Sequence, residues 1–227
     1  MALPHQLIGI AVIGLWLAVV TATALLVRRL RPDQQEWSRK VVHIGTGPVV
    51  LLAWWLQIDR LVALPVAAAM TLATALNHRL RLLPAVEDVG RHSYGTIAYG
   101  ASITLLLALL WPQQPLAVAA GVLVMAAGDG LAGLVGPLVR SPRWRLLGQS
   151  KSLAGTACMA VVSLMVLVGL AALAGITEHA APGLVALLGI AATATALEQL
   201  SSWGLDNATV PLATALLWQQ LSLPLTP

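Results

Sequence analysis

Residues 7–27 read LIGIAVIGLWLAVVTATALLV, a run of 21 residues without a charged side chain. At a rise of about 1.5 Å per residue, an α-helix of this length crosses the roughly 30 Å hydrocarbon core of a bilayer. The same character extends through the chain, because 58% of its 227 residues are hydrophobic and only 10% are charged. Soluble domains carry about 25% charged residues. The composition therefore predicts an integral membrane protein. It excludes a soluble enzyme, a disordered linker and a secreted disulfide scaffold, the last also because Cys158 is the single cysteine.

Further apolar, uncharged stretches bring the number of candidate transmembrane helices to eight. Four of them hold only 16 residues, so we expect their ends to extend into the flanking sequence or some spans to be incomplete. The last is the weakest, and a bundle of seven spans is the alternative. We predict an all-α, polytopic transmembrane helix bundle that forms one domain over residues 1–227. The candidate spans are Leu7–Val27, Val41–Leu56, Leu61–Leu76, Thr96–Trp111, Leu116–Val135, Leu153–Gly175, Gly183–Leu200 and Ala208–Leu223.

The basic residues fall on one side of this predicted bundle. Twelve of the thirteen lysine and arginine residues lie in the loops 28–40, 77–95 and 136–152, and the other loops contribute only Arg60. Loops rich in Lys and Arg usually face the cytoplasm. The three loops are therefore predicted to be cytoplasmic, with the N-terminus outside, and the C-terminus outside as well if there are eight spans.

Only three residues within the predicted spans can carry charge near neutral pH: His43, Asp129 and Glu198. An aspartate at the centre of a bilayer costs about 2.5–3.5 kcal/mol, so such groups are seldom retained without a partner or a task. His43 lies near the start of the second span, whereas Asp129 and Glu198 lie near the ends of the fifth and seventh. The predicted topology brings all three to the cytoplasmic face, which indicates a functional site there.

Asp129 stands between Gly128 and Gly130. Because glycine has no Cβ, these positions let another backbone or a phosphate come close, and they can unwind a helix locally. We interpret Asp129 as a hard oxygen ligand for Mg²⁺. The alternative is a helix-packing face of small residues that carries an incidental aspartate.

Lys151 lies between Ser150 and Ser152, just before the predicted start of the sixth span. An ammonium group, two hydroxyls and the first amides of a helix together form an anion site. The segment resembles the end of a phosphate loop, although Ser150 and Arg145 stand where the Walker pattern has glycine. The alternative is an ordinary basic flank of a membrane helix.

Asp206 and Asn207 follow Glu198 in the loop before the last span. They are candidate polar ligands at the same face, or alternatively an N-cap of the last helix. The segment Gly90–Tyr99, which contains Arg91 and other polar residues, adds further donors there.

Arg39 and Lys40 precede His43 at the start of the second span. The two cations are either a positive flank of the membrane helix or ligands for an anion. His43 adds a donor or a base that titrates near neutral pH, or it is a packing residue with its hydrogen bonds satisfied.

These acidic groups, the chain's two lysines and its many arginines suit a complex of Mg²⁺ with a nucleotide. Phosphoryl transfer depends mainly on a metal, on cationic groups at the phosphates and on an aligned acceptor hydroxyl. The nucleotide would arrive from the cytoplasm, and the acceptor would arrive sideways from the bilayer. The residues therefore favour a phosphotransferase that acts on a membrane lipid.

Four short motifs occur in order along the chain: Arg39-Lys40-x-x-His43, Gly128-Asp129-Gly130-Leu131-Ala132, Lys151-Ser152-x-x-Gly155, and Glu198 followed by Asp206-Asn207-x-x-Val210-Pro211. Their order and spacing resemble the polyprenol kinase family, which includes phytol kinase, dolichol kinase and the CTP-dependent diacylglycerol kinase. The resemblance covers about residues 36–220. The short chain and the segment Tyr94–Tyr99 are more similar to phytol kinases than to the longer dolichol kinases.

This resemblance implies that CTP is the phosphoryl donor, Mg²⁺ the cofactor and a lipid alcohol the acceptor. Phytol or a prenol such as geranylgeraniol would give the prenyl monophosphate, a reaction of isoprenoid and tocopherol metabolism. Asp129 and Asp206 are expected to bind Mg²⁺, with Glu198 as a third ligand or as the base that accepts the alcohol proton. The expected catalytic residues are Asp129, Glu198 and His43, and the expected nucleotide-binding residues are Lys151, Ser150, Ser152, Arg39, Lys40, Gly128 and Gly130.

Two other functions remain open at this point. A CTP:phosphatidate cytidylyltransferase shares the membrane setting and the nucleotide, but its acid-rich C-terminal signature is not visible in this sequence. A small transporter would use its intramembrane acids to relay protons or bind cations. Against the transporter, the charged groups are predicted to gather at one face, and the sequence shows no inverted repeat.

Overall fold

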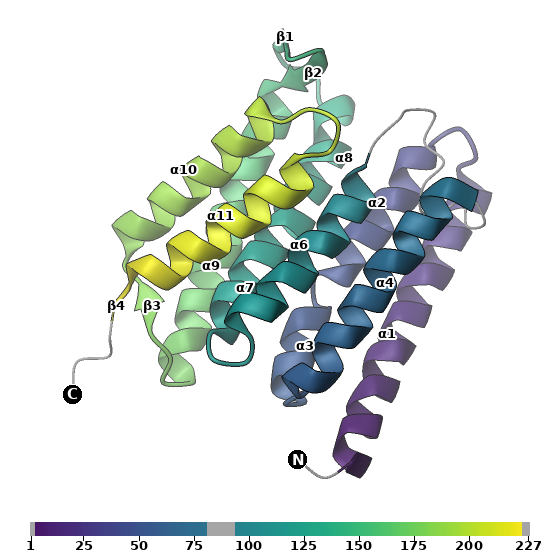
Figure 1. Ribbon diagram of the computed structural model, residues 1–227. Helices are drawn as coiled ribbons and strands as arrows, with labels where there is room; N and C mark the ends of the chain where they lie inside the picture. The colour runs from purple at the N-terminus through teal and green to yellow at the C-terminus, as the bar shows by residue number, and fades with distance from the viewer. Residues whose placement is uncertain (1–2, 81–93, 224–227) are drawn as a thin grey trace.

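The computed structural model of the chain describes residues 3–80 and 94–223, which fold into a bundle of helices lying side by side (Figure 1). The prediction of an all-α bundle is confirmed, with two short strand pairs added to it. The helices are α1 (Leu3–Leu30), α2 (Gln35–Thr46), α3 (Val49–Trp55), α4 (Arg60–Leu80), α6 (Gly95–Leu110), α7 (Pro115–Leu123), the π-helix η1 (Val124–Asp129), α8 (Gly130–Leu138), α9 (Leu153–Ile176), α10 (Leu184–Leu200) and α11 (Asp206–Leu221).

Seven of the eight predicted spans each lie within one continuous helical segment or extend beyond it by at most two residues, and the second is divided between two helices. Four helical rods are long and apolar enough to cross a membrane: α1, α4, α9 and the rod Pro115–Leu138, in which α7, η1 and α8 are continuous. Helices α6 and α10 are shorter and also apolar. Helix α4 has 21 residues, whereas its uncharged stretch Leu61–Leu76 has 16. Its ends extend into the polar flanks, as expected of a span whose apolar stretch is short.

The predicted second span is two helices, because α2 and α3 are separated at Gly47 and Pro48. Proline has no backbone N–H, and its ring disfavours a continuous helix. Gly47 is buried, and a Cβ built on it would lie 2.6 Å from the Cβ of Ala126 in η1. The glycine therefore allows the junction of α2 and α3 to lie against the rod that carries Asp129.

Helix α7 and η1 lie in the interior of the bundle. Almost every residue of α7 is buried, and most of them are small. A Cβ on Gly121 would overlap the carbonyl oxygen of Pro211, so the backbone of α11 lies directly against α7. Close packing of this kind through small residues is typical of membrane helices.

The strands β1 (Arg143–Leu146) and β2 (Gln149–Ser152) form an antiparallel hairpin within the predicted loop 136–152. The two turn residues, Leu147 and Gly148, have φ values of 50° and 77°. Positive φ at both positions is what a two-residue type I′ hairpin turn requires. The hairpin was not predicted from the sequence, because each strand has only four residues.

The two ends of the bundle differ in charge. The hairpin lies at the end where α8 and α10 finish, whereas the start of α1 and the short pair of β3 (Ala181–Pro182) and β4 (Ser222–Leu223) lie at the opposite end (Figure 1). Arg28 and Arg29 close α1 at the hairpin end, and Arg60 begins α4 at the other. The predicted separation of charge holds for these residues, while Arg81, Arg91 and the rest of 81–93 lie outside the described residues.

Candidate active site

Asp129 is the last residue of the π-helix η1, at a point where the apolar rod Pro115–Leu138 widens. π-Helical turns within α-helices occur frequently at functional sites. The Asp129 side chain is largely buried and faces α2, from which Lys40 and His43 approach it. The Lys40 Nζ lies 2.6 Å from Asp129 Oδ2 and donates to the Asp129 carbonyl oxygen at 3.2 Å. The widened turn thus presents both an acidic side chain and a main-chain acceptor to one lysine.

His43 contacts the same carboxylate. Its Nε2 lies 3.4 Å from Asp129 Oδ2 and 3.2 Å from the carbonyl oxygen of Met125, and its ring packs against Tyr99 at a centroid distance of 4.5 Å. A carbonyl oxygen only accepts hydrogen bonds, so the contact with Met125 requires a proton on Nε2. Of the roles left open by the sequence, this geometry favours His43 as a donor to the Met125 carbonyl oxygen, with its ring beside Asp129.

Lys151 and Glu198 form the second ion pair of the site. Lys151 lies on β2 and Glu198 near the end of α10, and the Nζ also donates to the Glu198 carbonyl oxygen at 2.8 Å. The neighbouring Gln199 Nε2 donates to Glu198 Oε2 at 2.6 Å and to Thr156 Oγ1 at 2.9 Å. Both carboxylate oxygens of Glu198 are therefore engaged.

Asp206 begins α11, and the helix has Leu205 rather than Asp206 at its N-cap position. The alternative interpretation of Asp206 and Asn207 as an N-cap is thus wrong. Asp206 Oδ1 accepts hydrogen bonds at 3.1 Å from both the backbone N–H and the side-chain amide of Asn207. Asp206 precedes the predicted span Ala208–Leu223. Burial, followed by the charge of Asp129, raises the pKa of the Asp206 carboxyl.

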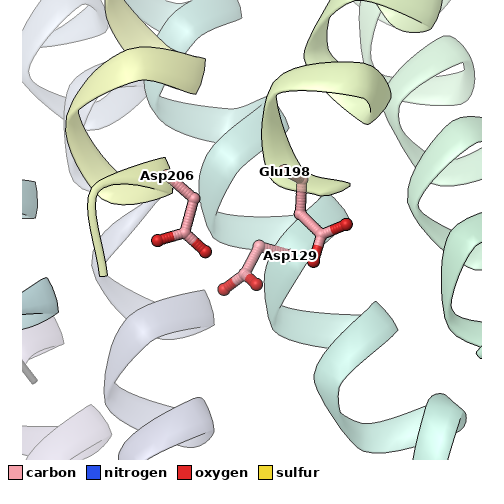
Figure 2. A group of neighbouring side chains, drawn as sticks. All are labelled: Asp129, Glu198 and Asp206. Atoms are coloured by element: carbon pink, nitrogen blue, oxygen red, sulfur yellow. The ribbon is translucent and has the colours of Figure 1, made fainter. Parts of the chain in front are cut away.

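The three carboxylates converge from η1, α10 and α11 and point toward one another (Figure 2). One ligand oxygen from each of Asp129, Glu198 and Asp206 lies within 4.8 Å of the others. Carboxylate oxygens are the hard ligands that Mg²⁺ prefers, and the ion is usually bound by one or two of them together with phosphate oxygens and water. The residues present therefore fit the metal that the sequence pattern implied.

A cavity of about 590 Å³ opens beside this cluster. Lys40, Lys151 and Arg143 provide its positive charges, and Trp37 in the first turn of α2 also lines it. A smaller recess of about 60 Å³ shares Lys40, Asp129, Gln149, Lys151 and Asp206 with the cavity, and adds Arg39 and Trp203. The cavity thus combines acidic metal ligands with cationic groups, as a bound metal–phosphate complex requires.

The two serines that were predicted to bind the nucleotide both line the cavity, but their hydroxyls differ in hydrogen bonding and exposure. Ser152 is the N-cap of α9: its Oγ accepts from the Gly155 N–H at 3.2 Å and donates to the Gly136 carbonyl oxygen at 3.4 Å. This hydroxyl is therefore occupied in fixing the helix start. Ser150 also lines the cavity but is exposed, so its hydroxyl is accessible to a ligand.

The structure places Gly128 and Gly130 against neighbouring helices, and neither is among the residues that line the cavity. A Cβ on Gly128 would lie 2.7 Å from Met159 Sδ in α9, and one on Gly130 would overlap Ile44 in α2. In this structure both glycines serve close helix packing, and their contact with the nucleotide stays a prediction. The sequence identified the need for close approach but not which partner approaches.

Several residues that line the cavity were not predicted from the sequence. Gly133 and Gly136 do line the cavity, and a Cβ on Gly133 would meet the Lys40 side chain. Their spacing from Gly130, one helical turn apart, was a visible signal. Gln149 and Gln199 had no such signal, because an uncharged amide near the end of a predicted span is common in membrane proteins. The expected donors Arg91, His92 and Ser93 lie outside the described residues.

Comparison with known proteins finds several phytol kinases that are similar to this chain. The phytol kinase of Synechocystis sp. is 42% identical over 219 residues, which cover 96% of this chain and 92% of that protein. The probable phytol kinase 1, chloroplastic, of Glycine max is 29% identical over 90% of this chain and 73% of its own length. The probable phytol kinase 2, chloroplastic, of Oryza sativa is 32% identical over 60% of this chain. No family model and no solved structure match the chain.

Proposed function

This chain belongs to the phytol kinase family, and from that premise we propose that it transfers the γ-phosphoryl group of CTP to the hydroxyl of phytol or of a related prenol such as geranylgeraniol. The product is the prenyl monophosphate. The observation that carries the proposal is the meeting of three carboxylates and two lysines from distant segments at one cavity. The choice of CTP rests on the family resemblance of the sequence motifs.

Each part of the site has a role in this reaction. Phosphoryl transfer depends on positioning and on stabilising charge that spreads over the phosphate oxygens. Lys40 and Lys151 stand at the cavity wall where they can donate to those oxygens, and exposed Arg143 adds a third positive charge. When bound to Asp129, Glu198 and Asp206, Mg²⁺ supplies further neutralisation of the phosphate charge.

The acceptor reaches the cavity from the lipid phase, because the carboxylates are carried by membrane helices. Its hydroxyl oxygen forms a bond to the γ-phosphorus while the bond from that phosphorus to the leaving nucleoside diphosphate breaks. The hydroxyl proton passes to a carboxylate of the cluster. His43 Nε2 lies 3.4 Å from Asp129 Oδ2 and helps to keep that carboxylate in place during the exchange.

The cavity lies at the end of the bundle that carries most of the described arginines. By the positive-inside rule we assign this end to the cytoplasm, where a water-soluble nucleotide is available. The start of α1 is then outside. A transporter is disfavoured, because Asp129, Glu198 and Asp206 gather at this end and form no path across the bundle.

A labelling assay tests the proposal. The purified protein is placed in liposomes with Mg²⁺ and a panel of phytol, geranylgeraniol and farnesol, and CTP is compared with ATP. Label from γ-labelled CTP is expected in an organic-soluble monophosphate. Transfer of label from α-labelled CTP to a lipid would instead support a cytidylyltransferase. Failure to label any alcohol with either nucleotide would refute the proposed function.

A further inference from the structure

Each of the two lysines in the chain holds one carboxylate of the proposed metal site. Lys40 Nζ lies 2.6 Å from Asp129 Oδ2 and 3.2 Å from the Asp129 carbonyl oxygen. Lys151 Nζ pairs with Glu198 Oε1 and lies 2.8 Å from the Glu198 carbonyl oxygen. Both ammonium groups thus bind the side chain and the main chain of one acidic residue, in the same way and from different segments.

Both pairs are sheltered from water. The side chains of Lys40 and Asp129 are 8% and 12% exposed, and those of Lys151 and Glu198 are 12% and 11% exposed. Removing one partner of a buried ion pair leaves an uncompensated charge, which is strongly unfavourable. Each lysine can therefore leave its carboxylate readily only when another anion is present to receive it.

A divalent cation alone meets an obstacle at this site. It would compete with two ammonium groups for Asp129 Oδ2 and Glu198 Oε1, and the displaced ammonium groups would stay beside it as like charges. Asp206 differs, because it forms no ion pair with any residue in 3–80 or 94–223 and accepts hydrogen bonds from Asn207. A free cation would thus find one carboxylate available and two occupied.

A nucleotide removes that obstacle, because its phosphate oxygens accept charge-assisted hydrogen bonds from ammonium groups. We infer that Lys40 and Lys151 exchange partners, pairing with the carboxylates in the empty protein and with phosphate oxygens in the loaded one, so that the divalent cation binds tightly only together with a nucleotide. This inference rests on the proposed function, since it takes a nucleotide as the ligand of the cavity. By linkage, the cation raises nucleotide affinity by the same factor.

The test measures metal binding rather than turnover. Mn²⁺ replaces Mg²⁺, and the electron paramagnetic resonance signal of free Mn²⁺ is titrated with the purified full-length protein in detergent. The titration is done with and without a CTP analogue that has a β,γ-imido bridge, corrected for Mn²⁺ bound by the analogue alone. Wild-type protein is expected to bind Mn²⁺ about 10- to 100-fold more tightly with the analogue, the usual range for coupled ligands.

Two lysine variants and one matched control sharpen this experiment. Lys40→Met and Lys151→Met should each bind Mn²⁺ alone several-fold more tightly than wild type and show a smaller enhancement by the analogue. Arg145→Met removes an exposed cation of the same hairpin that lies outside the cavity wall, and it should leave both affinities unchanged.

The outcomes separate the inference from the proposed function. Equal Mn²⁺ affinity of wild-type protein with and without the analogue overturns the partner exchange, even if the same preparation phosphorylates phytol. This comparison needs no variant, so it stands if a lysine variant fails to fold. Unchanged Mn²⁺ affinity in both folded lysine variants also overturns it. Strong coupling without transfer to any alcohol supports the exchange and refutes the proposed kinase activity.

Discussion

The interior rod Pro115–Leu138 and the outer helices α1 and α4 are all long and apolar. They differ in burial, in the size of their residues and in whether they carry a residue of the site. The best 18-residue stretch of the interior rod is 67% buried, whereas those of α1 and α4 are 11% and 6% buried. The interior rod is built from small residues and carries Asp129 at its π-helical turn. Hydrophobicity alone thus assigns a helix to the membrane, while residue size and the placement of one charge decide whether it carries the site.

The largest expected effect comes from removing the charge of the interior rod. Asp129→Asn should lower kcat by roughly 10³-fold, the scale of losing one electrostatic contact to the transition state. The amide keeps nearly the same shape but leaves the buried Lys40 ammonium without its counter-charge, so folding of the variant is checked by thermal unfolding before activities are compared. Activity is measured with labelled CTP and phytol in liposomes. Asp59→Asn, at the other end of the bundle before α4, is the control and should retain full activity. Near-normal turnover in the Asp129 variant would contradict the proposed role.

A smaller loss of activity is expected from a residue that positions a proposed metal ligand without binding the metal itself. Gln199→Leu removes the donor to Glu198 Oε2 at 2.6 Å. Loss of a hydrogen bond that orients a metal ligand typically weakens metal affinity by about 10- to 100-fold. The expected result is a higher Mg²⁺ concentration for half-maximal rate, with little change of rate at saturating Mg²⁺. Gln219→Leu, an exposed position of α11, should change neither quantity. Identical Mg²⁺ dependence in both variants would show that Gln199 does not position Glu198.

The same substitution should have opposite effects in the two kinds of helix. Gly121→Ala puts a Cβ against the Pro211 carbonyl oxygen, and the overpacking should lower the free energy of unfolding by about 1–3 kcal/mol. Gly14→Ala in α1 meets nothing within 4 Å, so the gain in helix propensity should leave stability unchanged or raised by up to about 1 kcal/mol. Thermal unfolding in detergent measures both. Equal destabilisation would show that the interior rod is no more tightly packed than α1.

The smallest effect is expected on the outer surface of α4. Leu72 is 70% exposed, and Leu72→Ala should change the free energy of unfolding by less than about 0.5 kcal/mol. Thermal unfolding of this variant beside Gly121→Ala measures the contrast in one experiment. A loss comparable to that of Gly121→Ala would indicate that α4 is covered by another subunit.

The sequence predicted the position of the acidic cluster because that inference needed only topology. Glu198 and Asp129 lie near the same ends of rods that run in the same direction, and Asp206 follows Glu198 by one short connection. Counting spans was sufficient to bring them together. The loop charge pattern then identified the same end as the one rich in cations.

Details that depend on the face of a helix could not be predicted in this way. Gly128 and Gly130 looked like a phosphate cradle, but their direction depends on the rotation of the rod, which the π-helical turn alters by one residue. Uniformly apolar spans carry no periodicity that would fix this rotation. The lysine pairs were equally hidden, because they join residues 89 and 47 positions apart.

The hairpin before α9 has a consequence for how this segment can evolve. Lys151 pairs in register with Trp144, and β2 ends directly at the Ser152 cap of α9. Neighbouring residues of a strand point to opposite sides, so the loss or gain of a single residue between Leu147 and Ser152 would turn the lysine away from Glu198. We therefore expect natural variants of this segment to differ in their side chains while conserving their number, so that here chain length is inherited as strictly as chemistry.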